Sequence, residues 1–578
     1  MRVCLAQINT TPGDFDGNLA RIQEGINRAQ ASGCDVVVFP ELAIPGYLSQ
    51  DLMYHDHFLS ENQRALQSIK ALSAKSGFER LLIVVGYLER NTRAGKPLFN
   101  AAAGLLGGEQ CFNHRKNLLP FYDVFDEQRY FESGSELTHF NFLGVQLGIA
   151  ICEDLWNDKG ESHYPSGNNP LARYQAAGTQ ILLSLNSSPY VHDKLNMRQR
   201  VISENLGDMS LVYVNQWGGQ DELVFDGQSF VMAQSAIIHQ STKTFEDDFA
   251  VVDCPTPHDP LPAAVLPKPI ALYDLLVTSV RDYAEKSGFE QLVIASSGGI
   301  DSALVIQIAC DAVGPKKVHA IRMPSIFSSK GAHLDAVALH ERLGCWDYEM
   351  PIAHEHVLAD LNRAFSNYDD PDNLVHQIQI TGRYNAIADQ NMQARLRDIY
   401  LMHFSNAFGA LALSTGNKTE SACGYYTHFD MNFGFAPLKD LYKHQVFSLA
   451  AEGQRIPAAI LTKPPSAELA PDQTDEASLL PYSVLDPLVQ AYIEDYVNRF
   501  EDFQVWVVKM SNHQKKISSN DKDLKDWLDD PASPEAYSGI IRLISMMEFK
   551  RRQTCPGPKV SKVAFGMGRR IPIVKKYI

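Results

Sequence analysis

Two groups of residues in this 578-residue sequence have types and spacing that could do chemistry. One is the stretch SSGGIDS, residues 296–302, which lies between an apolar run and a helical pattern. The other is an acid, an amine and a thiol, namely Glu41, Lys116 and Cys152, each at or just after the end of a strand-like run. The first pattern is typical of phosphate binding, and the second is typical of amide hydrolysis.

The stretch SSGGIDS follows the apolar run QLVIA and precedes the helical pattern ALVIQIAC. A glycine-rich turn at a helix N-terminus offers free backbone N–H groups and the positive end of the helix dipole to an anion. The stretch lacks the lysine of G-x-x-x-x-G-K-[ST], so it is less suited to gripping a γ-phosphate. Asp301 would be a poor phosphate partner but a good magnesium ligand beside one. A serine-capped turn without a ligand is the alternative.

Glu41 and Cys152 end apolar strands, where side chains can emerge into a cleft, and Lys116 follows a further strand-like run. In amide hydrolysis a thiolate attacks the carbonyl, a carboxylate shuttles the proton, and an ammonium stabilises the developing oxyanion. The flanking acids Glu153 and Asp154 oppose thiolate formation, whereas a nearby lysine favours it. Taken singly, a core cysteine and a helix-capping acid are the alternatives.

Strand-like and helical patterns alternate on both sides of a proline-rich segment, residues 253–270. Dense proline excludes a helix or a central strand there, which predicts a linker between domains 1–252 and 271–578. The alternation predicts two α/β cores. We expect strands at 2–8, 34–40, 81–89, 145–152, 180–186, 291–296, 318–324 and 409–415, and helices at 18–33, 302–314 and 391–409. The polar segment 516–539 is expected to be a loop or lid.

The composition narrows the function classes. A net charge of -16 argues against a general nucleic-acid binder, which needs clustered lysine and arginine. The 9 cysteines are scattered without a C-x-x-C, which argues against a zinc ribbon or redox dithiol and fits a reducing cytoplasm. No apolar run is long enough to span a bilayer, and the N-terminus lacks a signal-peptide pattern. We therefore expect a cytoplasmic protein without nucleic-acid or membrane partners.

The loop SGGIDS resembles the pyrophosphate loop of ATP pyrophosphatases, which split ATP between its α and β phosphates and adenylate a substrate. NAD, GMP and asparagine synthetases share it. Four further stretches resemble the NAD synthetases: LALSTGNKTESACGYYTHFDMNFGFAPLKDLYK, GRYNAIADQNMQARLRDIYLM, LTKPPSAELAPDQTDEASLLPYSVLD and EFKRRQTCPGPKVSKVAFGMGRRIPI. The chain departs from the more acidic run of that family at Asp389 and Gln390, which leaves the contacts of these two residues open.

This resemblance implies substrate contacts in the C-terminal half. The ATP contacts that it implies are Ala295, Ser296, Ser297, Gly298, Gly299, Ile300, Asp301, Ser302 and Thr415. The implied deamido-NAD contacts are Asn391, Glu420 and Lys550, and the implied magnesium ligands are Asp301 and Glu420. The alternatives are that Thr415 caps a helix, that Glu420 pairs with Lys418, and that Arg395 and Arg397 form a solvated helix face.

Three stretches of the N-terminal half, VVVFPELAIPGY, NHRKNLLPFYDVFDEQRYF and LGIAICEDLW, resemble the nitrilase superfamily. The resemblance implies a Glu–Lys–Cys triad of Glu41, Lys116 and Cys152 within an α-β-β-α sandwich. It also implies that Glu127 supports the triad. The glutamine contacts that it implies are Tyr122, Ser188 and Lys194.

Together the two halves resemble the glutamine-dependent NAD synthetase family over nearly the whole chain. This implies ATP-dependent amidation of deamido-NAD through an adenylate, with ammonia from glutamine, by a ligase that forms homo-oligomers. The expected fold is α/β, with a Rossmann-like parallel sheet in the second half. GMP and asparagine synthetases fit less well, because no cysteine follows the first Met and the triad order is Glu, Lys, Cys. A nucleotide-sensing module with a decayed amidase scaffold is the non-enzymatic alternative.

Overall fold

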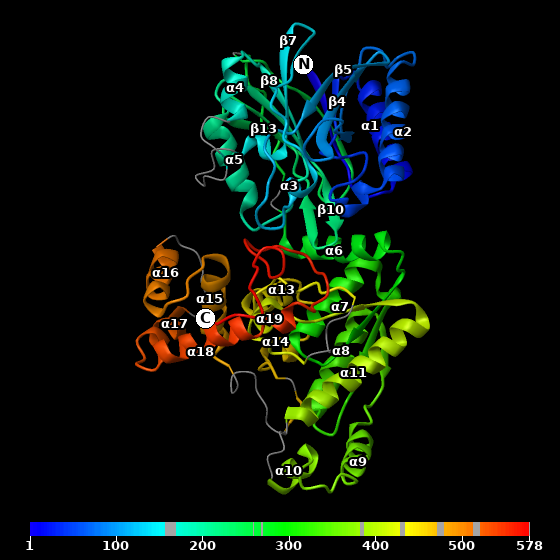
Figure 1. Cartoon of the computed structure of the whole chain (residues 1–578). Helices are drawn as coiled ribbons and strands as arrows, with labels where there is room; N and C mark the ends of the chain where they lie inside the picture. Colours follow the sequence, from blue (N-terminus) through cyan, green and yellow to red (C-terminus); the bar gives the residue numbers. More distant parts are fainter. Residues whose placement is uncertain are drawn as a thin grey trace. The chain divides into compact units, whose positions relative to one another are not determined.

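The computed structural model divides the chain into two units, Met1–Thr278 and Ser279–Ile578. Figure 1 colours the first unit from blue to green and the second from green to red. The residues that the structure describes are 1–156, 164, 169–257, 259–267, 270–381, 387–427, 434–466, 468–470, 479–512 and 521–576. Within this part of the chain no helix has the length and apolar composition needed to cross a membrane.

The first unit is built on two large sheets and a hairpin. Its strands are β1 (Arg2–Gln7), β2 (Val36–Val38), β3 (Leu82–Arg90), β4 (Leu98–Leu106), β5 (Glu109–Arg115), β6 (His139–Phe142), β7 (Val145–Ile151), β8 (Ile181–Asn186), β9 (Ser210–Asn215), β10 (Trp217–Gln220), β11 (Leu223–Asp226), β12 (Phe230–Ala233), β13 (Ala236–Gln240) and β14 (Asp248–Asp253). One sheet has the order β14-β1-β2-β3-β4-β5, the other has the order β13-β12-β9-β8-β7-β6, and β10 pairs with β11. The helices are α1 (Phe15–Ala31), η1 (Gln50–Tyr54), α2 (Asp56–Ser73), α3 (Glu127–Tyr130), η2 (Cys152–Leu155), α4 (Pro170–Ala176) and α5 (Lys194–Asn205).

The two sheets pack face to face, and helices cover both outer faces. Along β1, Val3 and Leu5 face the apolar layer between the sheets, while Cys4 and Ala6 face the layer beneath α1 and α2. Strands buried on both faces read as continuous apolar runs, which is why these segments stand out in the sequence. Figure 1 shows α1 and α2 on one side of the strands and α4 and α5 on the other. The predicted α-β-β-α sandwich is therefore confirmed.

The second unit contains a parallel sheet with the strands β15 (Gln291–Ala295), β16 (Val318–Arg322), β17 (Trp346–Glu349) and β18 (Ala410–Leu413). Its order is β17-β16-β15-β18, so the chain leaves β15 to one side and later returns on the other. In such sheets, ligands bind beyond the carboxyl end of the strand at which the order reverses. That strand is β15, and the SSGGIDS stretch follows it directly. The predicted Rossmann-like sheet is confirmed.

Helices surround this sheet and form a separate C-terminal cluster. After α6 (Leu272–Lys286), which spans the boundary between the units, the helices are α7 (Ile300–Val313), η3 (Pro315–Lys317), α8 (Lys330–Leu343), α9 (His354–Phe365), α10 (Leu374–Thr381), α11 (Ile387–Phe408), α12 (Lys418–Cys423), α13 (Lys443–Glu452), α14 (Ala458–Thr462), α15 (Tyr482–Glu494), α16 (Phe500–Asn512), α17 (Asp521–Leu528), α18 (Ser533–Met546) and α19 (Glu548–Arg551). One apolar cluster joins α15, α16, α17 and α18.

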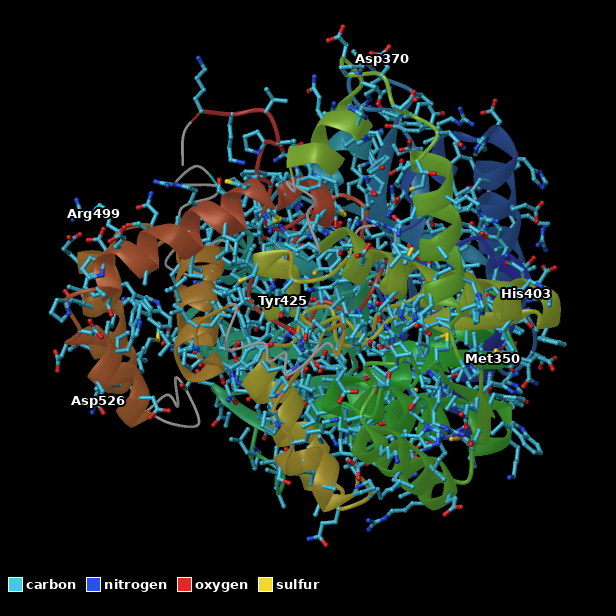
Figure 2. The ribbon with its side chains drawn as sticks, turned by 90° about the horizontal axis from the view of Figure 1, so that it is seen from below. Met350, Asp370, His403, Tyr425, Arg499 and Asp526 are labelled. Atoms are coloured by element: carbon cyan, nitrogen blue, oxygen red, sulfur yellow. The ribbon has the colours of Figure 1, made fainter. Side chains whose placement is uncertain are left out.

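The prediction of a loop or lid at 516–539 is wrong for most of that segment. Residues 521–528 form α17, and α18 begins at Ser533, while 516–520 lie outside the described residues. The charged residues of α17 hide a short apolar face, on which Leu524 is buried and Trp527 packs against Phe500. Figure 2 shows Asp526, on the polar face of α17, at the outer edge of the C-terminal helices.

The proline-rich segment is partly anchored to the first unit. Val265 accepts a hydrogen bond from the Gln240 N–H at 2.8 Å and donates its own N–H to the Ile238 carbonyl at 3.2 Å. These bonds pair Val265 with the edge strand β13, and neither of them requires an N–H from a proline. A short extended stretch of the segment therefore runs beside the sheet.

Candidate active sites

Glu41, Lys116 and Glu127 form a buried ion cluster in the first unit. The Lys116 Nζ lies 2.6 Å from Glu41 Oε1 and 2.9 Å from both carboxylate oxygens of Glu127. All three side chains are at most 1% exposed. Burial alone would lower the pKa of Lys116, but Glu127 and Glu41 raise it well above its ordinary value. The amine is therefore held as an ammonium ion between two acids.

The triad residues Glu41, Lys116 and Cys152 follow strand ends of both sheets. Glu41 follows β2, and Lys116 follows β5, where its N–H still pairs with the Asn100 carbonyl at 2.9 Å. Cys152 follows β7 of the other sheet, begins η2 and is buried. The thiol thus comes from one sheet, and the acid and the amine come from the other.

A sharp backbone turn presents Cys152. Its φ is 44°, in the left-handed region that residues with a side chain rarely adopt. Asp154 holds this turn, because its carboxylate accepts hydrogen bonds from the N–H groups of Ile151 at 2.9 Å, Asn117 at 3.0 Å and Leu118 at 2.8 Å. One side chain therefore fixes both the cysteine turn and the loop after Lys116. The sequence indicated only an acid that opposes thiolate formation.

The thiol of Cys152 is neutral before a substrate binds. Burial raises its pKa well above the ordinary value, and Glu41 raises it further, while Lys116 opposes both effects. A neutral thiol needs a base before it can attack. Glu41 is suitably held for that role, since its carboxylate accepts from Lys116, from the Asn100 amide at 2.7 Å and from the Ser187 N–H at 3.1 Å.

The second site begins with the turn between β15 and α7. The Ser297 hydroxyl accepts from the Gly299 N–H at 3.2 Å and lies 3.2 Å from the Ser302 hydroxyl, which donates to the Gly299 carbonyl at 3.0 Å. Gly298 has a φ of 77°, and a Cβ there would lie 2.3 Å from the Ala332 carbonyl oxygen. The turn therefore requires a glycine at this position, both for its backbone angle and for its close approach to α8.

Asp301 and Glu420 share one lysine that the sequence did not single out. The Lys443 Nζ lies 2.5 Å from Asp301 Oδ2 and 3.1 Å from Glu420 Oε1. Burial would lower the pKa of Lys443, but the carboxylates of Asp301 and Glu420 raise it above its ordinary value. The Asn417 amide also donates to Asp301 Oδ1 at 2.9 Å. The side chain of Asp301 thus points away from its own helix and does not cap it.

A cavity of about 300 Å³ opens beside this turn. It is lined by most of the turn, by Thr415 and Glu420, and by Lys443. Arg397 also lines it and donates to the Met323 carbonyl at 3.0 Å, so it is not simply a solvated residue. The combination of an anion-binding turn, acids and a cationic side chain suits a nucleotide with its metal ion.

The chain has relatives that match it from end to end. Residues 2–257 match the family Carbon-nitrogen hydrolase, and residues 272–522 match NAD synthase. The chain is 35% identical to the Glutamine-dependent NAD(+) synthetase of Thermotoga maritima, over 100% of this chain and 99% of that protein. It is 36% identical to the protein of the same name from Synechocystis sp., over 100% and 99%. The chain belongs to the glutamine-dependent NAD(+) synthetase family.

Solved structures of this synthetase family are also similar. The enzyme from Acinetobacter baumannii, solved in complex with ADP, has a TM-score of 0.69 at 32% identity, over 99% of this chain and 98% of that one. The enzyme from Cytophaga hutchinsonii has a TM-score of 0.73 at 19% identity, over 100% and 98%, which shows a shared fold. The predicted family, the predicted function and the ligase class are confirmed.

The three residues of this family member that are predicted to contact glutamine each have a different partner within the first unit. Tyr122 donates its hydroxyl to both oxygens of Glu153 at 2.8 and 2.9 Å, beside Cys152. Ser188 is buried, and its hydroxyl accepts from Arg198 at 3.3 Å. Lys194 donates to the Pro189 carbonyl at 3.2 Å.

Two of the three predicted deamido-NAD contacts, Asn391 and Lys550, meet at one segment, residues 424–427. Lys550 donates to the carbonyls of Gly424 and Tyr426, both at 2.7 Å, and burial lowers its pKa, with a smaller contribution from Arg395. The Thr427 hydroxyl donates to Asn391 Oδ1 at 2.9 Å. Tyr426 and Thr427 themselves line the cavity. Asn391 on α11 and Lys550 on α19 thus contact a segment of the cavity wall from behind.

The geometry of the second site bears on two alternatives, that Thr415 caps a helix and that Glu420 pairs with Lys418. Asn417, not Thr415, is the N-cap of α12, and it forms a capping box with Glu420. Lys418 pairs with Asp440 at 3.0 Å and with Glu494 at 3.3 Å, whereas Glu420 pairs with Lys443. Thr415 and Glu420 are therefore left to face the cavity.

Several residues of both sites carried no signal in the sequence. Asn100, Ser187 and Tyr47 hold the acids of the first site, and Tyr47 donates to Glu127 at 2.9 Å. Asn417 and Lys443 hold the acids of the second site. Both lie inside the stretch that resembles NAD synthetases, so the motif contained them, but nothing in their types or spacing paired them with Asp301.

Glu127→Gln should change the pH dependence of glutamine hydrolysis. Burial raises the pKa of Glu127 to about 7, with Lys116 opposing and Glu41 adding to the shift. Below that pH the group loses its charge and its hold on Lys116, so wild-type kcat/KM for glutamate release should fall as the pH drops through about 7. Glutamine at this position cannot ionise, so the variant should lack this acid limb and run roughly tenfold slower above it.

Glu132→Gln is the matched control, because Glu132 is an acid near Glu127 whose carboxylate instead accepts from the exposed Lys96 N–H at 2.8 Å. It should keep the wild-type pH profile. An unchanged acid limb in Glu127→Gln would contradict the supporting role of Glu127.

Proposed function

We propose that the chain makes NAD from deamido-NAD, ATP and glutamine through an adenylate intermediate, and releases AMP, pyrophosphate and glutamate. We assign glutamine hydrolysis to residues 1–252 and NAD synthesis to residues 271–578, with 253–270 as the linker. The observation that carries the proposal is that one chain combines the buried cluster of Glu41, Lys116 and Glu127 with a cavity at the SSGGIDS turn.

In the first unit, Glu41 takes the proton of the Cys152 thiol as sulfur attacks the side-chain carbonyl of glutamine. The carbonyl oxygen becomes an oxyanion, and the Lys116 ammonium stabilises it. Glu41 then returns the proton to the departing nitrogen, so ammonia leaves and a thioester remains. Water, activated by Glu41, releases glutamate and restores the thiol. The 2.6 Å contact between Lys116 and Glu41 supports this division of roles.

Tyr122, Ser188 and Lys194 are proposed to hold the glutamine. The amino acid carries an ammonium and a carboxylate, so its site needs charges of both signs. Lys194 supplies a cation, and the Tyr122 hydroxyl bonds to the carboxylate of Glu153. These groups would bind the charged end of glutamine and so place its side-chain amide at Cys152.

In the second unit, the nicotinate carboxylate of deamido-NAD attacks the α-phosphorus of ATP, and pyrophosphate leaves. Residues 295–302 and Thr415 would hold ATP, with the phosphates at the backbone N–H groups of the turn, the Ser297 and Ser302 hydroxyls and the dipole of α7. Asn391, Glu420 and Lys550 would place deamido-NAD through the cavity wall. Ammonia from the first unit then attacks the acyl adenylate, and AMP leaves.

Asp301 and Glu420 fit a magnesium ion that arrives with ATP. Carboxylate oxygens are ligands that Mg²⁺ prefers, and Mg²⁺ usually takes only one or two from the protein and the rest from phosphate and water. In the described residues no cluster of three or more acidic, histidine or cysteine side chains could hold a metal without substrate. Bound there, the ion would neutralise the charge of the departing pyrophosphate.

The test supplies ATP, magnesium and deamido-NAD with either glutamine or ammonium, and follows NAD and pyrophosphate. We expect both nitrogen sources to give NAD and pyrophosphate in equal amounts, and only glutamine to give glutamate. XMP or aspartate in place of deamido-NAD should release no pyrophosphate. Pyrophosphate release with either of these, but not with deamido-NAD, would overturn the proposal.

We also propose that the chain acts as a homo-oligomer in the cytoplasm. The resemblance to the family supports the oligomer, and light scattering on the purified chain would test it. The cysteines support a reducing compartment, since all of them are free.

A further inference from the structure

A series of polar contacts runs from the cavity, where Ser296 and His340 are buried, to Asp347, which is exposed at the edge of the parallel sheet. The Ser296 Oγ lies 2.9 Å from His340 Nε2, and His340 Nδ1 lies 2.6 Å from Asp347 Oδ1. Arg322 holds the same carboxylate with two bonds, from Nε at 2.8 Å and from Nη2 at 2.7 Å. Ser296 and His340 are buried, and Ser296 also lines the cavity.

The ionisation of Asp347 determines which atom donates in each hydrogen bond of this series. Arg322 and His340 keep the pKa of Asp347 below its ordinary value, so the carboxylate is ionised and can only accept. His340 must therefore donate from Nδ1. Burial lowers the pKa of His340, which keeps the ring neutral and leaves Nε2 without a proton. The Ser296 hydroxyl must then donate its proton to Nε2.

We propose that Ser296 Oγ acts in the cavity as a hydrogen-bond acceptor only, and selects ATP through a hydrogen-bond donor on its nucleoside. This inference rests on the proposed function, in which the cavity holds ATP. Because the serine proton is committed to His340, only lone pairs remain on the oxygen for a ligand. Lone pairs repel phosphate oxygens, so the partner of Ser296 is the nucleoside and not the triphosphate.

Two groups of adenosine could supply the donor, the 6-amino group of adenine and a ribose hydroxyl. Nucleotides that lack one of them separate the two. Inosine triphosphate carries an oxygen acceptor in place of the amine, and 2′-deoxy- and 3′-deoxy-ATP each lack one hydroxyl. Selectivity is measured as the kcat/KM for pyrophosphate release with ATP divided by that with each analogue. The assay contains deamido-NAD and ammonium, so the first unit is not needed.

Ser296→Ala removes the acceptor and should lower one of these ratios by about tenfold, the order expected for one lost hydrogen bond. A change in the inosine ratio identifies the amine as the donor, and a change in a deoxy ratio identifies the hydroxyl. His340→Gln keeps Ser296 but no longer forces the serine hydroxyl to donate its proton away from the cavity. This variant should lower the same ratio by a smaller factor. A selectivity ratio does not respond to a general loss of folded enzyme.

Glu349→Gln is the matched control, because Glu349 accepts from Arg322 Nη1 at 3.1 Å but does not touch His340 or Ser296 in the contacts above. It should keep the wild-type ratios. Unchanged ratios in Ser296→Ala, or an equal loss with all four nucleotides, would overturn the inference. Wild-type pyrophosphate release from ATP in the same assay separates this failure from a failure of the proposed function.

Discussion

Cys152→Ala should abolish NAD synthesis from glutamine and leave synthesis from ammonium at the wild-type rate. Without the sulfur no thioester forms, and neither Glu41 nor Lys116 can replace it as a nucleophile. We expect the glutamine-driven rate to fall by at least about a thousandfold, as when a covalent catalyst is removed. The side chain is small and buried, so alanine preserves the packing between the sheets. NAD formation with each nitrogen source is the measurement.

Ammonium-driven synthesis by the same variant controls for folding, since it uses only the second unit. Cys111→Ala is the matched control for loss of a thiol, because Cys111 lies on β5 of the same unit but is exposed. It should retain synthesis from both nitrogen sources. Glutamine-driven synthesis at full rate in Cys152→Ala would show that the assigned triad is not the site of ammonia release.

Asp301→Asn should abolish synthesis from both nitrogen sources while glutamate release by the first unit persists. The substitution removes the charge that holds Lys443 at 2.5 Å and that would face magnesium beside the pyrophosphate. Asp301 would act by holding the metal ion that neutralises the departing pyrophosphate, and the loss of one such electrostatic stabiliser costs about a hundredfold to a thousandfold in rate. Pyrophosphate release with ammonium as donor is the measurement, and glutamate release is followed in parallel.

Asp311→Asn provides the comparison on the same helix. Asp311 lies at the other end of α7 and pairs with the partly exposed Arg455 at 2.6 Å, outside the cavity. The Asp311→Asn substitution removes one negative charge from α7 and leaves the contacts of Lys443 and Glu420 unchanged. We expect it to keep nearly wild-type synthesis. If Asp301→Asn matched Asp311→Asn in rate, the metal and phosphate roles of Asp301 would be refuted.

The positions of Glu41, Lys116 and Cys152 could be predicted because Glu41 and Cys152 end apolar runs and Lys116 follows a strand-like run. Strand ends are visible in a sequence, and reactive residue types are rare there. Asn100 and Ser187 could not be found in this way, because they support Glu41 only through the register of β4 and the end of β8. Amides and hydroxyls are common, so their types alone carry no signal.

The second site shows the same limit across a longer distance in the chain. Asp301 was predicted from its place after two glycines, but Lys443 follows it by 142 residues. Only the fold, which packs α13 against α7, reveals that they pair. The segment 516–539 failed for a different reason. Its charged composition hid the short apolar period of α17 and the start of α18.

The lysine between Asp301 and Glu420 has a consequence for how the enzyme tolerates an empty site. Two acids facing one another would repel and loosen the phosphate-binding turn whenever substrate was absent. Lys443 is a counterion for both acids, so the turn keeps its shape when no substrate is bound. On the proposed roles of Asp301 and Glu420, magnesium would arrive with the nucleotide and would not be needed for the folded structure. A chelator would stop the reaction, yet the ligand-free protein would melt at an unchanged temperature.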